Sequence, residues 1–289
     1  MATARSAPHP AFVLHQWAWS ETSLILDLFT REQGRIAVVA KGAKRPYSQL
    51  RPVLMPFQRL LVLTSRPKAD EGTDILALRS AEYAGAGAAL PPAQLFSGFY
   101  LNELLLKLLA RGDPHERLFD TYADTLLALA TGQAEDESPL RAFELVLLRE
   151  TGVLPALGHS TTTQAPVAPS GCYHLLAEAG LVPAAASDVA ISGAVCLALQ
   201  AALGQHDLAA LRAICLACLP ALKIQLRALL AYHLGSAPLR TRQMMLDVRR
   251  LIEPVSPAFT SACSPATPPA TPPAIQPATQ PAASPASPP

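Results

Sequence analysis

Five short, mainly apolar segments in the first third of the chain have a strand-like pattern. Short apolar segments bounded by turn residues are typical of β-strands, in which successive side chains point to opposite faces. Turns that contain glycine or proline separate the segments, as expected between short strands. Five strands of this length are typical of a small β-barrel. The predicted strands cover residues 11–17, 23–30, 34–41, 54–63 and 73–79.

After Ser80 the spacing of apolar residues changes to that of amphipathic helices. Leucine and aromatic residues recur every three or four positions, which places them on one helix face. Helices are predicted over 94–110, 115–130 and 138–151, and the third begins at Ser138 followed by Pro139, a common first-turn arrangement. Residues 153–180 are rich in threonine, proline and glycine, and we expect them to be ordered but irregular.

Two more helices are predicted before residue 234. Ser187 or Asp188 would cap a helix that ends at Leu203, and Asp207 would cap a longer one that reaches His233. Pro220 should kink the longer helix, because proline removes a backbone donor. The apolar stretch 189–203 is shorter than the roughly 20 residues that span a bilayer, and residues 1–10 lack the apolar core of a signal peptide. The sequence therefore predicts a cytoplasmic protein that has no membrane partner.

The last 36 residues, 254–289, contain twelve prolines and no Lys, Arg, Asp or Glu. This composition is typical of a disordered, partly polyproline-II segment. The predicted fold class is α+β: a five-stranded barrel followed by an all-α helical domain and a disordered tail. The expected division is a flexible N-terminus at 1–10, the barrel at 11–82, the helical domain at 83–252 and the tail at 253–289.

Charge is unevenly distributed, although the net charge is only +1. Residues 31–68 hold nine Lys or Arg and a single acid, Glu32. Residues 86–222 hold six Lys or Arg against thirteen Asp or Glu, and residues 223–250 hold six Lys or Arg against Asp247. Two basic regions therefore flank an acidic one, a distribution that favours binding to a polyanion.

The first basic region starts on the third predicted strand. Ile36, Val38 and Ala40 would face one side of this strand, while Arg35 and Lys41 would face the other. The loop 42–46, Gly-Ala-Lys-Arg-Pro, then ends the strand and carries two more cations. This pattern predicts a rigid barrel that presents positive charge to phosphates.

Three motifs of the chain resemble the RecO family. The first is Glu21-Thr22 with the F-T-R-E-x-G turn at Phe29–Gly34 and the A-K-G-A-K-R-P loop at Ala40–Pro46. The second, F-E-x-x-L-L-R-E-x-G, lies at 143–152, and the third, L-G-x-x-P-L-x-T-R, lies at 234–242. The resemblance spans residues 11–251 and implies that the barrel has the oligonucleotide/oligosaccharide-binding (OB) fold.

The resemblance also implies a function in DNA repair and recombination. RecO proteins bind single- and double-stranded DNA and anneal complementary strands. With RecR, and in many bacteria RecF, they help to load RecA onto strands coated by single-stranded-DNA-binding protein, whose acidic C-terminal tail they engage through the helical domain. A nucleoid-associated location follows from the same resemblance. Available cations for the tail are Arg111, Arg117, Arg141 and Arg149.

The candidate DNA-binding residues are the cations of the first basic region: Arg31, Arg35, Lys41, Lys44, Arg45 and Arg51. They would neutralise phosphates and read little of the base sequence. Tyr47, on the loop tip, is the aromatic residue expected to be free for stacking on a base. The other nearby aromatic residues, Trp17, Trp19, Phe29 and Phe57, are expected in the barrel core.

No motif for catalysis is present, whether a G-x-S-x-G, a Walker A loop, a G-x-G-x-x-G or an H-E-x-x-H. Many RecO proteins carry four zinc-binding cysteines, but here Cys215 and Cys218 lie in a helical pattern and no second pair exists. We therefore expect no enzymatic activity, no metal and no cofactor. The alternative function is that of a protein-binding adaptor with no direct role on DNA, in which the basic regions only increase solubility.

Overall fold

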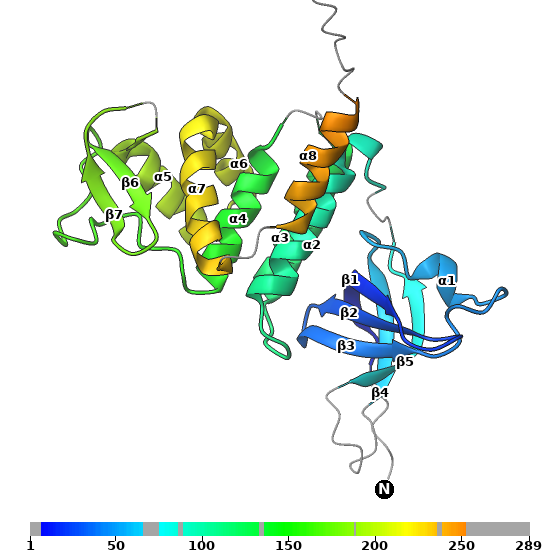
Figure 1. Ribbon diagram of the computed structural model, residues 1–289. Coiled ribbons are helices and arrows are strands. Elements are labelled where there is room, and N and C mark those ends of the chain that lie inside the picture. Colours follow the sequence, from blue (N-terminus) through cyan, green and yellow to red (C-terminus); the bar gives the residue numbers. More distant parts are fainter. Residues whose placement is uncertain are drawn as a thin grey trace, which may run out of the picture. The chain divides into compact units, whose positions relative to one another are not determined.

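The structure, a computed structural model, describes residues 7–65, 75–85, 89–132, 136–187, 189–235 and 239–252. Five strands form a closed barrel in the order β1-β2-β3-β5-β4 (Figure 1). They are β1 (His9–Ala18), β2 (Leu24–Thr30), β3 (Gly34–Ala40), β4 (Leu60–Ser65) and β5 (Leu76–Tyr83). β3 pairs with β5 in parallel and β1 pairs with β4 in antiparallel orientation, which closes the sheet. The predicted five-stranded barrel is confirmed, although β1 already begins within the segment expected to be flexible.

The barrel interior is filled by leucine, isoleucine, valine and alanine side chains. Ile36, Val38 and Ala40 of β3 are buried there, so the predicted inward face of this strand is confirmed. Ala11 and Val13 come from β1 and face the same core. Side chains, and not a ligand cavity, are the usual filling of a barrel this small.

The fourth strand is shorter than expected. Residues 54–63 were predicted to be extended, but β4 begins only at Leu60, after the short helix α1 (Leu50–Val53). Pro56 lacks the N–H that a strand interior requires, and Phe57 adopts a positive φ of 66°. The fifth strand runs four residues past the predicted end at Arg79, and residues 73 and 74 of that prediction lie outside the described part.

The first three predicted helices are confirmed. They are α2 (Leu95–Leu108), α3 (Glu116–Thr131) and α4 (Ser138–Glu150), and a 3-10 turn, η1 (Pro92–Gln94), precedes α2. Their buried leucines form one apolar core with α5–α7, described below. Gly132 and Thr151 follow α3 and α4, close to the predicted ends.

Residues 153–180 are less irregular than expected. They contain β6 (Cys172–Leu176), which pairs with β7 (Gly180–Ala184) and β8 (Ile191–Ser192) in a three-stranded sheet. Tyr173 and Leu175 of β6 are buried, so a short alternation of apolar residues was present within the polar composition. The segment is too short for that alternation to stand out from the surrounding threonine and proline.

The later helices also differ from the prediction. α5 (Gly193–Gln205) is capped by Ser192, whose hydroxyl accepts from the Val195 N–H, and not by Ser187. Asp207 caps α6 (Leu208–Ala217) as expected, with 2.9 Å from its carboxylate to the Ala210 nitrogen. The predicted single helix to His233 is instead two helices, because α7 (Leu219–Leu234) starts anew and Pro220 lies in its first turn, where a missing N–H costs little.

Among the helices that the structure describes, no single one is long and apolar enough to cross a bilayer. Only α6 and α7 counted together reach that length and composition. The chain bends by 106° between these two helices. The predicted tail at 253–289 lies outside the described residues.

An eighth helix, α8 (Arg240–Ile252), was not predicted and is held at its start by Glu103 of α2. The Glu103 carboxylate accepts hydrogen bonds from the Arg240 and Thr241 N–H groups, both at 2.9 Å, and from the Thr241 hydroxyl at 2.7 Å. Burial opposes ionisation of Glu103, but these hydrogen bonds prevail, and the pKa of Glu103 lies below its ordinary value. A carboxylate distant in sequence therefore supplies the cap that α8 lacks locally.

The outer face of β1 and β2 packs on the helices through aromatic rings. Phe12 lies edge-on to Tyr122 of α3 with 4.9 Å between ring centroids, and Phe29 lies 5.4 Å from Phe119. The Asn102 side chain donates to the Leu14 carbonyl oxygen at 3.0 Å and accepts from the Tyr122 hydroxyl. This junction is buried and its polar groups are paired, so the outer face of β1 and β2 shares one apolar core with the helices, separate from the core inside the barrel.

Candidate nucleic-acid interface

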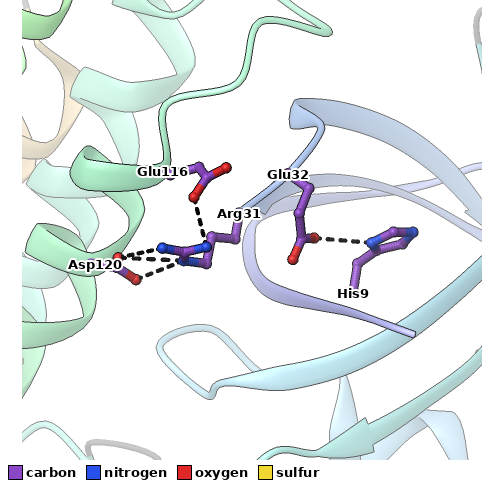
Figure 2. Close-up of polar contacts among 5 residues, drawn as sticks. All are labelled: His9, Arg31, Glu32, Glu116 and Asp120. Atoms are coloured by element: carbon purple, nitrogen blue, oxygen red, sulfur yellow. Dashed lines mark hydrogen bonds and ion pairs between the residues drawn. The ribbon is translucent and has the colours of Figure 1, made fainter. Parts of the chain in front are cut away.

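Arg31, the first candidate DNA-binding residue, is directed at helix α3. Its Nη1 lies 2.7 Å from a carboxylate oxygen of Glu116, and its Nη2 lies 3.0 Å from Asp120. Figure 2 shows the guanidinium between these two carboxylates, while the neighbouring Glu32 turns away to His9 at 2.9 Å. The hydrogen bond and the charge of Asp120 raise the pKa of Arg31 above its ordinary value. Arg31 is thus engaged within the protein.

Arg35 is also used in contacts with the helices. Its Nη1 donates to the Leu106 carbonyl oxygen at 2.8 Å, and its own carbonyl oxygen accepts from the Gly112 N–H at 2.9 Å. Partial burial lowers the pKa of Arg35, because the charged form loses solvation. Nearby, Arg111 lies 3.4 Å from the buried carboxylate of Asp27. Both arginines therefore lie at the junction of barrel and helices, apart from the remaining candidates.

The other four candidates are exposed and close together in the chain. All four lie within eleven residues of sequence. Lys41, Lys44 and Arg45 follow the end of β3, and Arg51 is in α1. None of the four forms an ion pair with any residue that the structure describes. Their charges are therefore available to a ligand from solution.

The loop that carries Lys44 and Arg45 is anchored where it leaves β3. Ala43 is fully buried in the barrel core, and Gly42 adopts the positive φ of 72° that the turn requires. The Lys44 N–H donates to the Thr22 carbonyl oxygen and its Nζ donates to the Ser20 carbonyl oxygen, each at 2.9 Å. The loop is thus tied to the β1–β2 turn, and it holds its charges without needing to order on binding.

Aromatic residues beside this loop are more exposed than expected. Tyr47 is 95% exposed, in agreement with the prediction, but Trp19 is 63% and Trp17 is 42% exposed, so the expectation that the tryptophans lie in the core is wrong. The last four residues of β1 are all exposed, which shows that no described element covers this end of the strand. Phe29 and Phe57 are buried, although in the cluster shared with the helices and not inside the barrel.

The second basic region is divided between two helices. Lys223 of α7 pairs with Glu137 at 2.5 Å, and Arg250 of α8 lies 3.5 Å from Asp247. Arg227 and Arg242 are exposed. Several of these charges thus have partners on the protein itself, and the region is a weaker candidate for DNA than the loop after β3.

Cysteine and histidine residues do not gather into a metal centre in the described residues: no group of three or more His, Cys, Asp or Glu there could hold an ion. Cys215 is fully buried in the helical core, and burial raises the pKa of its thiol. The Cys218 thiol lies 3.2 Å from the Ile214 carbonyl oxygen. A buried protonated thiol is a poor ligand, and the absence of a bound metal stays a prediction.

A pocket of about 450 Å³ lies between α3, the start of α4 and α6. Leu127 and Leu216 on its wall are each 57% exposed, and Arg212 also lines it. The Nε and Nη2 atoms of Arg212 are buried and have no hydrogen-bond partner among the described residues. The pocket therefore combines apolar surface with the Asp124 and Asp136 side chains and with an arginine whose Nε and Nη2 are covered by protein atoms.

The sequence did not identify Arg212 as a candidate site residue. Of the four arginines considered for a partner tail, Arg111 pairs with Asp27, Arg141 is buried against Glu144, and the Arg149 guanidinium donates to the Leu203 carbonyl oxygen. Of these four arginines, only Arg117 is exposed and has no side-chain partner among the described residues. A single arginine among the leucines of α6 carries no signal in the sequence, because its lack of a partner depends on how three helices pack.

Comparison with known proteins places both halves of the chain in one family. Residues 5–83 match the family model for the recombination protein O N terminal, and residues 92–243 match that for the recombination protein O C terminal. The chain is 52% identical over 264 residues to the DNA repair protein RecO of Acidovorax ebreus (strain TPSY), covering 87% of this chain and 100% of that protein. It is 50% identical over 256 residues to the DNA repair protein RecO of Polaromonas naphthalenivorans (strain CJ2), with coverage of 87% and 100%. The closed barrel, the helical domain and these matches together show that the chain belongs to the RecO family of DNA repair proteins.

Proposed function

We propose that the protein binds single- and double-stranded DNA through Lys41, Lys44, Arg45 and Arg51 and anneals complementary strands. The observation that carries this proposal is a group of four exposed cations on the loop after β3 and on α1, none of which has an ion-pair partner among the described residues. Lysine and arginine neutralise phosphates and release their counterions, which supplies most sequence-independent affinity for DNA. Arg31 and Arg35 instead hold the barrel to the helices, and we leave them out of the DNA contacts.

Annealing follows from the same electrostatics and needs no bond to be made or broken by the protein. Two single strands repel each other through their phosphates, and a fixed group of cations screens that repulsion. Contacts to phosphates leave the base edges free to pair. The protein would therefore act as a mediator without an active site, a metal or a cofactor.

The partners are proposed from membership of the family. In this proposal the protein works with RecR, and with RecF where the cell has it, to load RecA onto DNA coated by single-stranded-DNA-binding protein. These steps take place on the DNA of the nucleoid in the cytoplasm. The barrel contributes the DNA contact and the helical domain contributes the contact to the single-strand binder.

The DNA contact is tested by the dependence of affinity on salt. The triple variant Lys41→Gln/Lys44→Gln/Arg45→Gln removes three charges from the loop, and we expect it to bind a single-stranded oligonucleotide about 10- to 100-fold more weakly at low salt. The slope of log K against log salt should become shallower by about 2, since each phosphate contact on a single strand contributes about 0.7. Fluorescence anisotropy of a labelled oligonucleotide measures both quantities.

The control is Arg117→Gln, which removes an exposed charge from α3. It should leave the slope unchanged. A triple variant with the slope of the unmodified protein would contradict the assignment of the loop. If the unmodified protein binds no oligonucleotide even at low salt, the adaptor function without a role on DNA is correct.

We further propose that the pocket around Arg212 receives the C-terminal tail of the single-strand binder. That tail is expected to be acidic with an apolar end, which matches exposed Leu127 and Leu216 beside an unsatisfied guanidinium. A terminal carboxylate would accept a charge-assisted hydrogen bond from Arg212 once this side chain turns into the pocket, and the contact has to outweigh repulsion by Asp124 and Asp136 on the same wall. The helical domain would thereby hold the coated strand near the barrel.

A synthetic acidic peptide with an apolar C-terminal residue tests this pocket. Arg212→Ala should weaken binding of the peptide about tenfold, because a charged hydrogen bond is lost. Amidation of the peptide's C-terminus should weaken binding to the unmodified protein by a similar factor. Arg117→Ala, which lines a different pocket, is the matched control. Equal affinity for the free-acid and amidated peptides would rule out the proposed carboxylate contact.

A further inference from the structure

Both tryptophans of the chain lie at the same end of the barrel. The sequence contains two, Trp17 near the end of β1 and Trp19 in the turn after it. Trp17 packs edge-on against the His15 ring with 4.4 Å between centroids, and it is less than half exposed. Trp19 has 63% of its surface exposed. What distinguishes Trp19 from other exposed side chains is that a second exposed aromatic residue, Tyr47, and exposed cations lie on the adjoining loop.

The turn that carries Trp19 is joined to the basic loop. The Trp19 N–H donates to the Ser23 carbonyl oxygen at 3.2 Å, which closes the turn. Within the same turn, the Ser20 and Thr22 carbonyl oxygens accept from the side chain and the backbone of Lys44. An exposed indole and an exposed ammonium are therefore held on neighbouring segments by short hydrogen bonds, with Tyr47 three residues further along the loop.

We propose that Trp19 stacks on an unpaired base and so makes this face of the barrel select single strands over duplex. The inference rests on the proposed binding of DNA by the loop, and it adds a specificity that the cations cannot supply. Phosphate contacts alone do not favour single strands, since a duplex carries the higher charge density. The flat faces of paired bases are covered by their neighbours in the helix, whereas a single strand can present a face to an aromatic ring.

The same contact has a consequence for annealing. While two strands are separate, each can be held by its phosphates and by one stacked base. Once they pair, the base returns to the duplex stack and the contact to Trp19 is lost. The annealed product is then held by phosphate contacts only, so it leaves the protein more easily than the substrate strands.

Affinities for two matched ligands test the selectivity. The ligands are an oligo(dT) and a hairpin duplex with the same number of phosphates, each measured by anisotropy against the full-length protein. Trp19→Ala should bind the oligo(dT) about tenfold more weakly while its affinity for the hairpin changes less than about twofold. Trp19→Phe keeps an aromatic face and should recover most of the loss. Tyr232→Ala, which removes an exposed aromatic side chain from α7, is the control and should change neither affinity.

Intrinsic fluorescence gives a second, direct measurement, because Trp17 and Trp19 are the only two tryptophans in the sequence. In Trp17→Phe the sole fluorophore is Trp19, and saturating oligo(dT) should quench its emission strongly. In Trp19→Phe the sole fluorophore is Trp17, and the quenching should be much smaller.

Three results would overturn the inference: equal losses of affinity for both ligands in Trp19→Ala, no loss for either ligand, or no quenching of Trp19 by bound oligo(dT). Each of these leaves binding by the basic loop in place. A failure of the proposed function has a different signature, in which the unmodified protein binds neither ligand at low salt.

Discussion

Gly34→Ala is expected to lower the free energy of unfolding by about 3–4 kcal/mol. Gly34 begins β3 with a φ of +64°, a conformation that costs an L-residue energy. A Cβ atom at this position would also lie 1.8 Å from the backbone oxygen of Asp113 and 2.4 Å from its carbonyl carbon. Since Asp113 belongs to the connection between α2 and α3, relief of this overlap would push the helices away from the barrel. Urea denaturation followed by circular dichroism measures the change.

The matched control is Gly112→Ala, one residue from Asp113. Gly112 has a similar φ of +72°, but no described atom lies within 4 Å of its added Cβ. Its free energy of unfolding should fall by only about 1–2 kcal/mol, which is the cost of a left-handed backbone conformation for a residue with a Cβ. Equal denaturation midpoints for the two variants would contradict this prediction. They would mean that the Asp113 backbone moves away from the added Cβ at little cost in free energy.

Glu144→Ala is expected to destabilise the helical domain by about 3–5 kcal/mol, because it leaves a buried arginine without its counter-charge. Glu144 is fully buried in α4, and its Oε1 lies 2.6 Å from the Arg141 guanidinium and accepts from the Tyr100 hydroxyl at 2.6 Å. Burial raises the pKa of Glu144, and the charge of Arg141 opposes that shift. The Arg141 Nε and Nη1 atoms already lack partners among the described residues. Thermal or urea unfolding of the variant measures the loss.

Two comparisons separate the effect of the unpaired buried charge from other causes of the lost stability. Glu137→Ala breaks a pair with Lys223 whose side chains are 36% and 27% exposed, and it should cost about 1 kcal/mol or less. Tyr100→Phe/Arg141→Met/Glu144→Leu removes the whole cluster and should restore stability close to that of the unmodified protein. If the triple variant is as unstable as Glu144→Ala, packing volume and not unpaired charge explains the loss.

The elements that the sequence predicted well are those with a long, regular pattern. The strands at 23–30 and 34–41 are continuous apolar segments bounded by turn residues, and the helices at 94–110, 115–130 and 138–151 repeat over several turns, so the local pattern sufficed to define them. The errors fall where a pattern is short or broken. β6 has five residues, and the prediction of a strand from Leu54 overlooked Pro56.

The candidate site was harder to predict because burial of a charge depends on tertiary contacts. Arg31 and Lys44 have equal standing in the sequence, yet Arg31 lies between two carboxylates of α3, whereas Lys44 is exposed and bonds only to a backbone oxygen. The exposure of Trp19 could not be deduced either, since a tryptophan near a strand end is buried or open according to what covers it. The unpaired nitrogens of Arg212 likewise depend on how the helices around it pack.

The aromatic junction between barrel and helices also determines how the protein responds to its ionic surroundings. Added electrolyte screens charges on an exposed loop, whereas contacts between buried rings such as Phe12 and Tyr122 do not weaken with it. If the loop binds nucleic acid as proposed, a rise in electrolyte would release it and leave the body that carries the loop intact. One folded molecule could then repeat capture and release many times.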